Sequence, residues 1–170
     1  MVSIEKQISY ISKNGLGNFV KYKNTEDFLE LDTETREFLK DYGIYSYEYT
    51  LPALITDGLL KKYNDDLIFV GYDDVNQKYC ININTKELVL VMANNKQLVV
   101  NSSIQKLIEA QYTLNEYIDK YESKEVLGEY QLNHKKYAQK LKEMLEVVES
   151  NIMQYPIWAN QISERELGTI

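Results

Sequence analysis

The residues best suited to nucleophilic chemistry are two adjacent serines, Ser102 and Ser103, which follow an apolar run. A serine hydrolase needs glycines around its nucleophile so that a strained turn can pack, and neither serine has a neighbouring glycine. It also needs a histidine base, and the single histidine, His134, is flanked by lysines on a helical segment. The serines therefore fit better as the cap of a helix that begins at Ile104, where a hydroxyl accepts a backbone N–H bond.

The remaining candidates for catalytic or metal chemistry are one cysteine, Cys80, and four aspartates. Cys80 stands between strand-forming residues, so we expect a small buried side chain and not a reactive thiol. One histidine and one cysteine cannot supply a zinc site with nitrogen and sulfur ligands. The aspartates could hold Ca²⁺ or Mg²⁺, but they lack the alternating ligands and central glycine of an EF-hand loop. We expect polar loop residues at Asp65, Asp66, Asp73 and Asp74, with no metal, no cofactor and no catalytic site.

The composition is that of an acidic globular protein. Its 170 residues are 44% hydrophobic and 26% charged, which suits one domain with a buried core. The formal net charge of −7 disfavours nucleic acid as a partner, because phosphate contacts need clustered Lys and Arg, and it favours a basic protein. A lone cysteine fits a reducing compartment. The N-terminus lacks the apolar region of a signal peptide, and no apolar run is long enough for a membrane span, so we expect a cytoplasmic protein.

Apolar spacing predicts helices in the N-terminal part of the chain. Isoleucines recur at helical spacing over residues 4–12. A second helix is expected within residues 32–43, and Asp32, Thr33 or Thr35 can cap its start.

Three tyrosines alternate in the segment that follows. In an extended chain Tyr45, Tyr47 and Tyr49 lie on one face. Such a row could form an interaction surface, because tyrosine is enriched at binding hot spots. A half-buried edge strand is the alternative that we favour.

Residues 67–100 change to a period of two, which is typical of strands. Four candidate strands are separated by short stretches rich in turn-forming residues, and short connections make consecutive strands antiparallel neighbours. Helical spacing resumes over residues 104–121 and again over residues 131–152, where Pro156 is expected to end the second helix. The only tryptophan, Trp158, is expected to anchor the tail to the body of the protein.

These segments together predict an α+β fold. We expect an antiparallel β-sheet meander of about four to six strands, flanked by N-terminal helices and covered by C-terminal helices. The chain is expected to form a single domain over residues 1–170, in which residues 130–170 are a C-terminal helical extension.

Four stretches occur in the order "LDTETREFLKDYG", "LIFVGYDD", "KYCININTKELVLV" and "LVVNSSIQKLIEAQ". This order resembles the SUKH superfamily (the SMI1/KNR4-like proteins) and looks closest to its SUKH-4-type bacterial immunity proteins. The "GYD" of the second stretch resembles the family's G-x-D at the end of a central strand, and "NSS" in the fourth resembles its N-x-S before a helix. Lys86 stands where the family usually has a turn glycine. The resemblance covers residues 31–118.

What this resemblance implies is an immunity protein of a polymorphic or contact-dependent bacterial toxin system. Such a protein is no enzyme: it binds a cognate toxin domain, often a nuclease, and neutralises it. The expected partner is a basic protein, with no nucleic acid and no membrane, and the chain itself could be a monomer or a homodimer. The candidate toxin-binding residues are exposed acids and tyrosines: Asp65, Asp66, Asp73, Asp74, Tyr45, Tyr47 and Tyr49.

Two alternatives remain open at this point. The chain could be a non-enzymatic SMI1/KNR4-like regulatory module that binds several partners. It could also be an enzyme of an acid-based type, in which case alanine substitutions at Asp73 and Asp74 would remove turnover.

Overall fold

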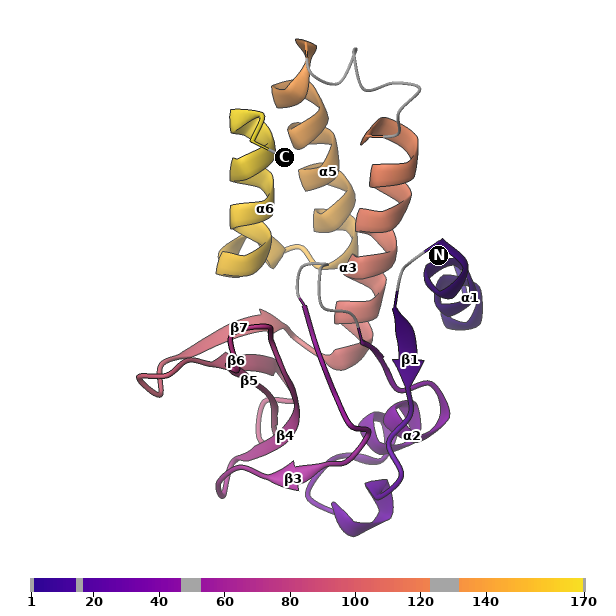
Figure 1. Ribbon diagram of the computed structural model, residues 1–170, viewed down its shortest axis with the longest axis vertical. Coiled ribbons are helices and arrows are strands. Elements are labelled where there is room, and N and C mark those ends of the chain that lie inside the picture. The colour runs from indigo at the N-terminus through magenta and orange to yellow at the C-terminus, as the bar shows by residue number, and fades with distance from the viewer. Residues whose placement is uncertain (1, 15–16, 47–52, 123–131, 170) are drawn as a thin grey trace.

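The computed structural model of the protein describes residues 2–14, 17–46, 53–122 and 132–169. Over these residues the fold is α+β, with a five-stranded antiparallel sheet between N-terminal and C-terminal helices (Figure 1). The predicted fold class is therefore confirmed. None of the described helices combines the length and the apolar character that a membrane crossing requires.

The N-terminal part has two helices and a small sheet. Its elements are α1 (Ile4–Asn14), β1 (Asn18–Val20), a 3₁₀ turn (Thr25–Asp27), α2 (Thr33–Asp41) and β2 (Ile44–Ser46). β1 and β2 pair antiparallel as a separate two-stranded sheet. Both predicted helices are confirmed, and Asp32 caps α2 by accepting the Thr35 backbone N–H at 3.1 Å. Gly43 follows α2 with φ of 79°, and a Cβ there would lie 2.1 Å from the Val20 carbonyl oxygen, so the turn requires glycine.

The main sheet is a meander in which each strand is antiparallel to the next. Its strands are β3 (Lys61–Lys62), β4 (Leu67–Tyr72), β5 (Lys78–Asn82), β6 (Leu88–Val91) and β7 (Gln97–Asn101). The last four confirm the predicted strands, and β3 adds a two-residue edge strand that the period-two pattern did not predict. Positive φ values close the turns after β4, β5 and β6, at Asn76 (63°), Lys86 (66°) and Asn95 (61°).

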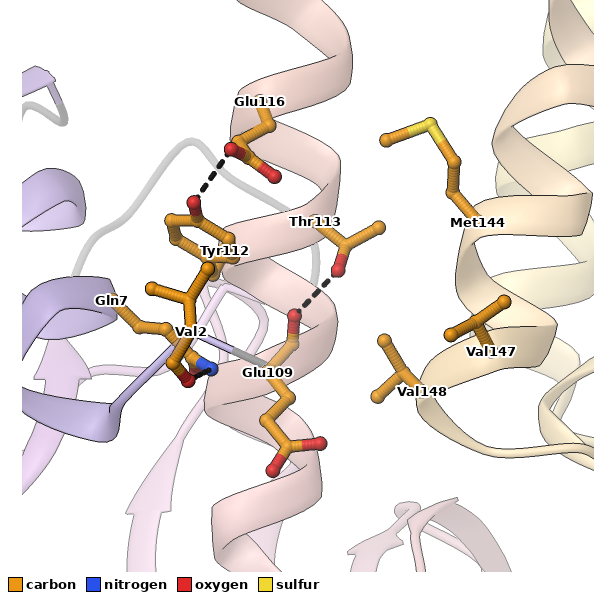
Figure 2. Close-up of a pocket in the computed structure, with 9 residues that line it drawn as sticks. All are labelled: Val2, Gln7, Glu109, Tyr112, Thr113, Glu116, Met144, Val147 and Val148. Atoms are coloured by element: carbon orange, nitrogen blue, oxygen red, sulfur yellow. Dashed lines mark hydrogen bonds between the residues drawn. The ribbon is translucent and has the colours of Figure 1, made fainter.

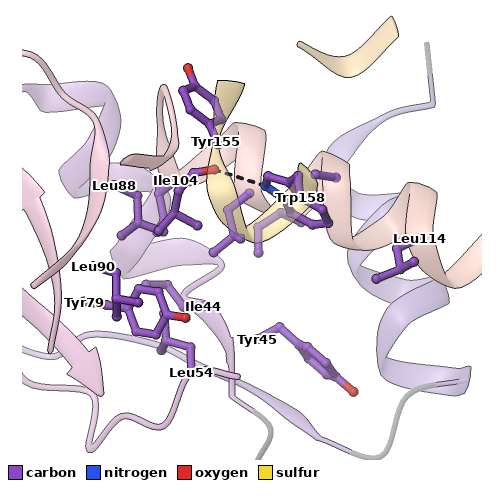
Figure 3. Close-up of a cluster of buried hydrophobic side chains, with 14 of the residues drawn as sticks. Ile44, Tyr45, Leu54, Tyr79, Leu88, Leu90, Ile104, Leu114, Tyr155 and Trp158 are labelled. Atoms are coloured by element: carbon purple, nitrogen blue, oxygen red, sulfur yellow. Dashed lines mark hydrogen bonds between the residues drawn. The ribbon is translucent and has the colours of Figure 1, made fainter. Parts of the chain in front are cut away.

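The sheet buries side chains on both of its faces. One face contributes Tyr79, Leu88 and Leu90 to the main core, where Figure 3 shows them with Trp158 and other buried side chains. The other face carries a smaller buried cluster of Leu67, Cys80, Val89 and Val91. Cys80 is fully buried, and burial raises the pKa of its thiol to about 12. The interpretation of Cys80 as a core residue is therefore confirmed.

The C-terminal helices follow the sheet. They are α3 (Ile104–Tyr117) with a π-helical extension (Ile118–Glu122), α5 (His134–Val148), a 3₁₀ turn (Ile152–Gln154) and α6 (Pro156–Leu167). Ser103 caps α3, since its Oγ accepts the Lys106 backbone N–H at 3.2 Å. The prediction that Pro156 ends the second helix is wrong: α5 ends at Val148, and Pro156 opens α6 instead. Proline fits the first turn of a helix, where no intrahelical N–H bond is lost.

A buried polar network joins the end of the sheet to these helices. Glu149, which is 8% exposed, accepts hydrogen bonds from Asn101 Nδ2 at 3.0 Å, the Ser102 backbone N–H at 3.1 Å and the Tyr155 hydroxyl at 2.8 Å. The indole N–H of Trp158 donates to Asn101 Oδ1 at 3.1 Å. The predicted anchoring by Trp158 is confirmed, and every atom of this network that faces the core has a partner in the described structure.

Candidate acidic binding groove

The first pair of predicted contact aspartates lies in the turn between β3 and β4. Asp65 is exposed, and its carboxylate lies 3.2 Å from Lys62 Nζ. Asp66 is also exposed and accepts a hydrogen bond from Asn84 Nδ2 at 2.9 Å. Both aspartates can be reached from solvent, and both already have a neighbouring polar partner.

The second pair lies in the turn between β4 and β5, at the other end of β4. Asp73 Oδ1 accepts the backbone N–H groups of Val75 at 3.0 Å and Gln77 at 2.7 Å, so this carboxylate holds its own turn. Asp74 is exposed. A six-residue strand spans about 20 Å, and the two aspartate pairs therefore do not form one cluster.

The predicted tyrosine face is not a surface where the structure describes it. Tyr45 is 1% exposed, and the expectation that it is exposed is wrong. Its hydroxyl accepts the Gly17 backbone N–H at 2.8 Å, and its ring packs 5.5 Å from that of Phe19. β2 pairs with β1 against the body of the protein, which buries Tyr45 more fully than the half-buried edge strand that we favoured. Tyr47 and Tyr49 lie outside the described residues.

A different set of carboxylates lines a groove that follows α3, with α1 and α2 on one side and α5 on the other. It consists of three hollows of about 460, 270 and 440 Å³. Glu109 lines the first and second hollows, and Glu116 lines the second and third, so the three adjoin. Figure 2 shows the middle hollow, where side chains of α5 face those of α3. We call this the acidic groove, and its carboxylates are Glu34, Glu37, Asp41, Glu109, Glu116 and Asp119.

Helical spacing explains how these carboxylates come together. Glu34, Glu37 and Asp41 occupy positions i, i+3 and i+7 of α2 and share one face. Glu109 and Glu116 lie two turns apart on α3 and likewise share a face. The apolar stripes that identify these helices in the sequence do not indicate the site. The charged stripes were present in the sequence, but nothing there indicated that α2 and α3 are neighbours.

Most of the groove carboxylates carry charge that the protein does not neutralise. Glu109 pairs with Lys106 at 2.7 Å. Among the described residues, no Lys, Arg or His lies within ion-pairing distance of the other five. Two lysines, Lys120 and Lys140, line the far end of the groove. The groove therefore has an excess of negative charge that suits a cationic partner.

Neutral tyrosine hydroxyls hold two of these carboxylates in place. The Tyr112 hydroxyl donates to Glu116 Oε1 at 2.5 Å, and the Tyr10 hydroxyl donates to Asp119 Oδ2. Burial, and then the hydrogen bond to Glu116, raises the pKa of Tyr112 to about 12. Burial and the bond to Asp119 likewise raise the pKa of Tyr10. Both phenols therefore remain donors at neutral pH and orient the carboxylates without cancelling their charge.

The lining of the groove combines carboxylates with tyrosine and apolar side chains. In the part of the chain that the structure describes, no three His, Cys, Asp or Glu side chains are grouped so that they could hold a metal ion. His134 lies on α5 and does not line any of the three hollows. The chemistry that the groove offers is attraction of positive charge next to apolar side chains such as Met144 and Val148.

No protein-family model matches this chain, and neither the curated proteins nor the solved structures contain a significant match.

Proposed function

We propose that this protein is an immunity protein that binds a basic toxin domain of a polymorphic or contact-dependent toxin system through its acidic groove, and so neutralises it. The observation that carries the proposal is the convergence of carboxylates from α2 and α3 with few cations to balance them. A nuclease is the toxin class that suits this surface best, because nucleases present positive charge to the phosphates of their substrate.

The mechanism is occlusion by a complementary surface. Opposite potentials speed the encounter of two proteins, and a net charge of −7 adds long-range attraction to the local charge of the groove. Once the basic surface of the toxin is bound in the groove, the phosphates of the toxin's substrate must compete with the carboxylates of the groove for the same cationic side chains. Binding of this kind weakens as salt concentration rises, since exposed charges are screened.

The local structure also supports the resemblance on which the toxin partner rests. Lys86 has φ of 66°, the left-handed conformation that favours glycine, and glycine is the residue that the family pattern has at this turn. Asp73 of the "GYD" stretch closes the turn after β4, and Ser103 of "NSS" caps α3. Asp73 and Ser103 are thus positions of the resemblance that hold a turn and a helix start, and Lys86 has the backbone conformation of the glycine that it replaces.

The test is co-expression with the toxin. If a large secreted protein with a variable C-terminal domain is encoded beside this chain, that C-terminal domain is the partner to use. We expect wild-type protein to restore growth and to bind the purified domain. The groove variant Glu37→Lys/Glu116→Lys should bind on the order of 100-fold more weakly and lose protection. Failure of the wild-type protein both to bind and to protect would end the proposal.

A second pair of substitutions separates the effect of the groove on binding from the effect of the net charge. The variant Asp65→Lys/Asp74→Lys changes the net charge by the same amount but lies in the sheet turns. We expect its affinity to stay within about 3-fold of wild type, because the turns lie outside the groove. If this control loses binding and the groove variant keeps it, the turns are the interface. Capture of several partners with no toxin among them would favour the regulatory module instead.

A further inference from the structure

The middle hollow of the acidic groove combines apolar walls with negative charge. Val2 of the N-terminal segment, Val148 and Met144 of α5 line it, and Val147 at its edge is 82% exposed (Figure 2). Val147 therefore leaves apolar surface open to solvent at the edge of the hollow. A ligand with a hydrocarbon stem would cover this surface.

The donors and acceptors that line the hollow differ in how far they are satisfied within the protein. Three lining side chains carry donors, and each of these groups already makes a hydrogen bond: Tyr112 donates to Glu116 at 2.5 Å, Thr113 donates to the Glu109 carbonyl at 2.9 Å, and one N–H of Gln7 Nε2 donates to the Val2 carbonyl at 3.0 Å. The acceptors are left over, and they include the Glu116 carboxylate, which has no cation at ion-pairing distance among the described residues. A ligand that completes this hollow must therefore bring donors.

Gln7 provides an independent indication of the same kind. Its side chain extends from α1 toward α3, is 4% exposed and lines the hollow (Figure 2). Its Oε1 atom is buried and has no hydrogen-bond partner within the described structure. Buried amide oxygens are nearly always hydrogen-bonded, so this unpaired acceptor, on a residue that lines the hollow, indicates that a donor is missing there.

We infer that the middle hollow captures an arginine side chain of the basic partner. The inference rests on the proposed function for the identity of that partner, but the hollow can be tested without it. The guanidinium carries five N–H donors and no acceptor, which complements a site where Glu109 and Glu116 each keep one carboxylate oxygen without a hydrogen bond from the described residues. Its methylene stem packs against Met144 and Val148 while the charged head faces Glu116 and Glu109.

Arginine fits better than lysine for two reasons. Its planar fork bonds carboxylates with two parallel N–H groups, whereas an ammonium acts as a point charge. It is also less strongly hydrated, so that its transfer into a partly apolar hollow costs less. The hollow therefore sets a preference for arginine at one position of the partner's surface.

The experiment is a titration followed by methyl NMR of the methionines, of which the chain has four. Met144 lines the hollow, and Met92 and Met153 are internal controls because they do not. The probe is N-acetyl-arginine methylamide, compared with its neutral citrulline analogue and with the lysine compound. We expect a saturable shift of Met144 with a millimolar Kd for arginine, weaker binding of lysine by about 3-fold, and weaker binding of citrulline by about 10-fold.

Two variants test the assignment. Glu116→Gln keeps an acceptor for Tyr112 and removes the charge, and should weaken the arginine probe by about 5-fold. Glu143→Gln lies on α5 outside the hollow and should leave the probe's affinity unchanged.

Several outcomes would overturn the inference: no saturable shift of Met144 up to about 50 mM arginine probe, equal shifts with citrulline, or equal loss in both variants. These outcomes are distinct from failure of the proposed function. If the protein still protects against the toxin but the hollow does not bind the arginine probe, only the inference of an arginine site is contradicted. If the hollow binds the arginine probe but the protein neither binds nor neutralises a toxin, only the proposed function is contradicted.

Discussion

The carboxylates of the helical groove and those of the sheet turns differ in what they contact. Glu34, Glu37 and Glu116 face a groove in which no described cation pairs with them. Asp73 instead accepts two backbone N–H groups of its own turn, and Asp65 lies beside Lys62. A carboxylate that neither pairs with a cation nor accepts the backbone N–H groups of its own turn keeps its charge available to a partner, and this makes it a binding candidate.

Glu149 is the clearest example of a carboxylate whose hydrogen bonds stabilise the fold. It is the most deeply buried carboxylate among the described residues, and its oxygens accept three hydrogen bonds from the joint between the sheet and the C-terminal helices. Burial of such a group is tolerated only because its charge is fully hydrogen-bonded. If this contrast is right, substitutions of the carboxylates that stabilise the fold should lower stability, and substitutions of the groove carboxylates should weaken binding.

The largest effect on stability is expected at Glu149. Glu149→Ala removes the acceptor of Asn101 Nδ2, the Ser102 N–H and the Tyr155 hydroxyl, and buried donors without partners are costly. We expect the free energy of unfolding to fall by about 3 kcal/mol in urea denaturation. Glu146→Ala on α5, which ends one residue before Glu149, is the control, because Glu146 is part of a surface pair with Lys142 at 4.0 Å and its loss should cost less than about 0.5 kcal/mol. Equal stability of the two variants would contradict the contrast.

A smaller effect is expected within the sheet turns. Asp73→Ala deletes the acceptor of the Val75 and Gln77 backbone N–H groups, and we expect a loss of about 1–2 kcal/mol in the same denaturation assay. The adjacent variant Asp74→Ala should stay within about 0.5 kcal/mol of wild type, because Asp74 is exposed. Both variants should still neutralise the toxin. Loss of neutralisation by a folded Asp74→Ala protein would instead assign binding to the turns.

The smallest effect is expected at the start of α3. Ser103→Ala removes the cap that accepts the Lys106 N–H and should lower the free energy of unfolding by about 1 kcal/mol. Ser102→Ala is the matched control, since Ser102 takes part in the joint through its backbone N–H, which the substitution keeps. Neutralisation should survive in both variants. A folded Ser103→Ala protein without any function would reopen the reading of this serine as a nucleophile.

Much of the fold could be predicted from local signals in the sequence. The period-two pattern of residues 67–100 predicted four strands of the meander, and helical spacing predicted α1, α2 and α3. The caps at Asp32 and Ser103 were among the candidates that the sequence offered. These signals are local, because a backbone hydrogen bond at a helix start or a tight turn depends on a few neighbouring residues.

The errors lie where a local signal has two meanings. Pro156 can follow one helix or open the next, and the structure places it in the first turn of α6. Tyr45 alternates as an edge-strand residue would, yet it is 1% exposed because its side chain packs into the main core beside Phe19. The choice of the four aspartates as contact residues stays a prediction, and the backbone bonds of Asp73 depend on a turn that its residue type alone does not specify.

The sequence by itself determined the element types, the caps, the turn positions and an acidic net charge of −7, all of which depend on residue type and short-range spacing. Only the tertiary structure decided which carboxylates act together. Glu37 and Glu116 are distant in the chain, and they line adjoining hollows of one groove because α1 packs against α3 and α2 borders the same hollow as both. The helices lie together because apolar faces that are far apart in the sequence are buried against one another. The charged faces of the same helices are brought together as a consequence of this packing.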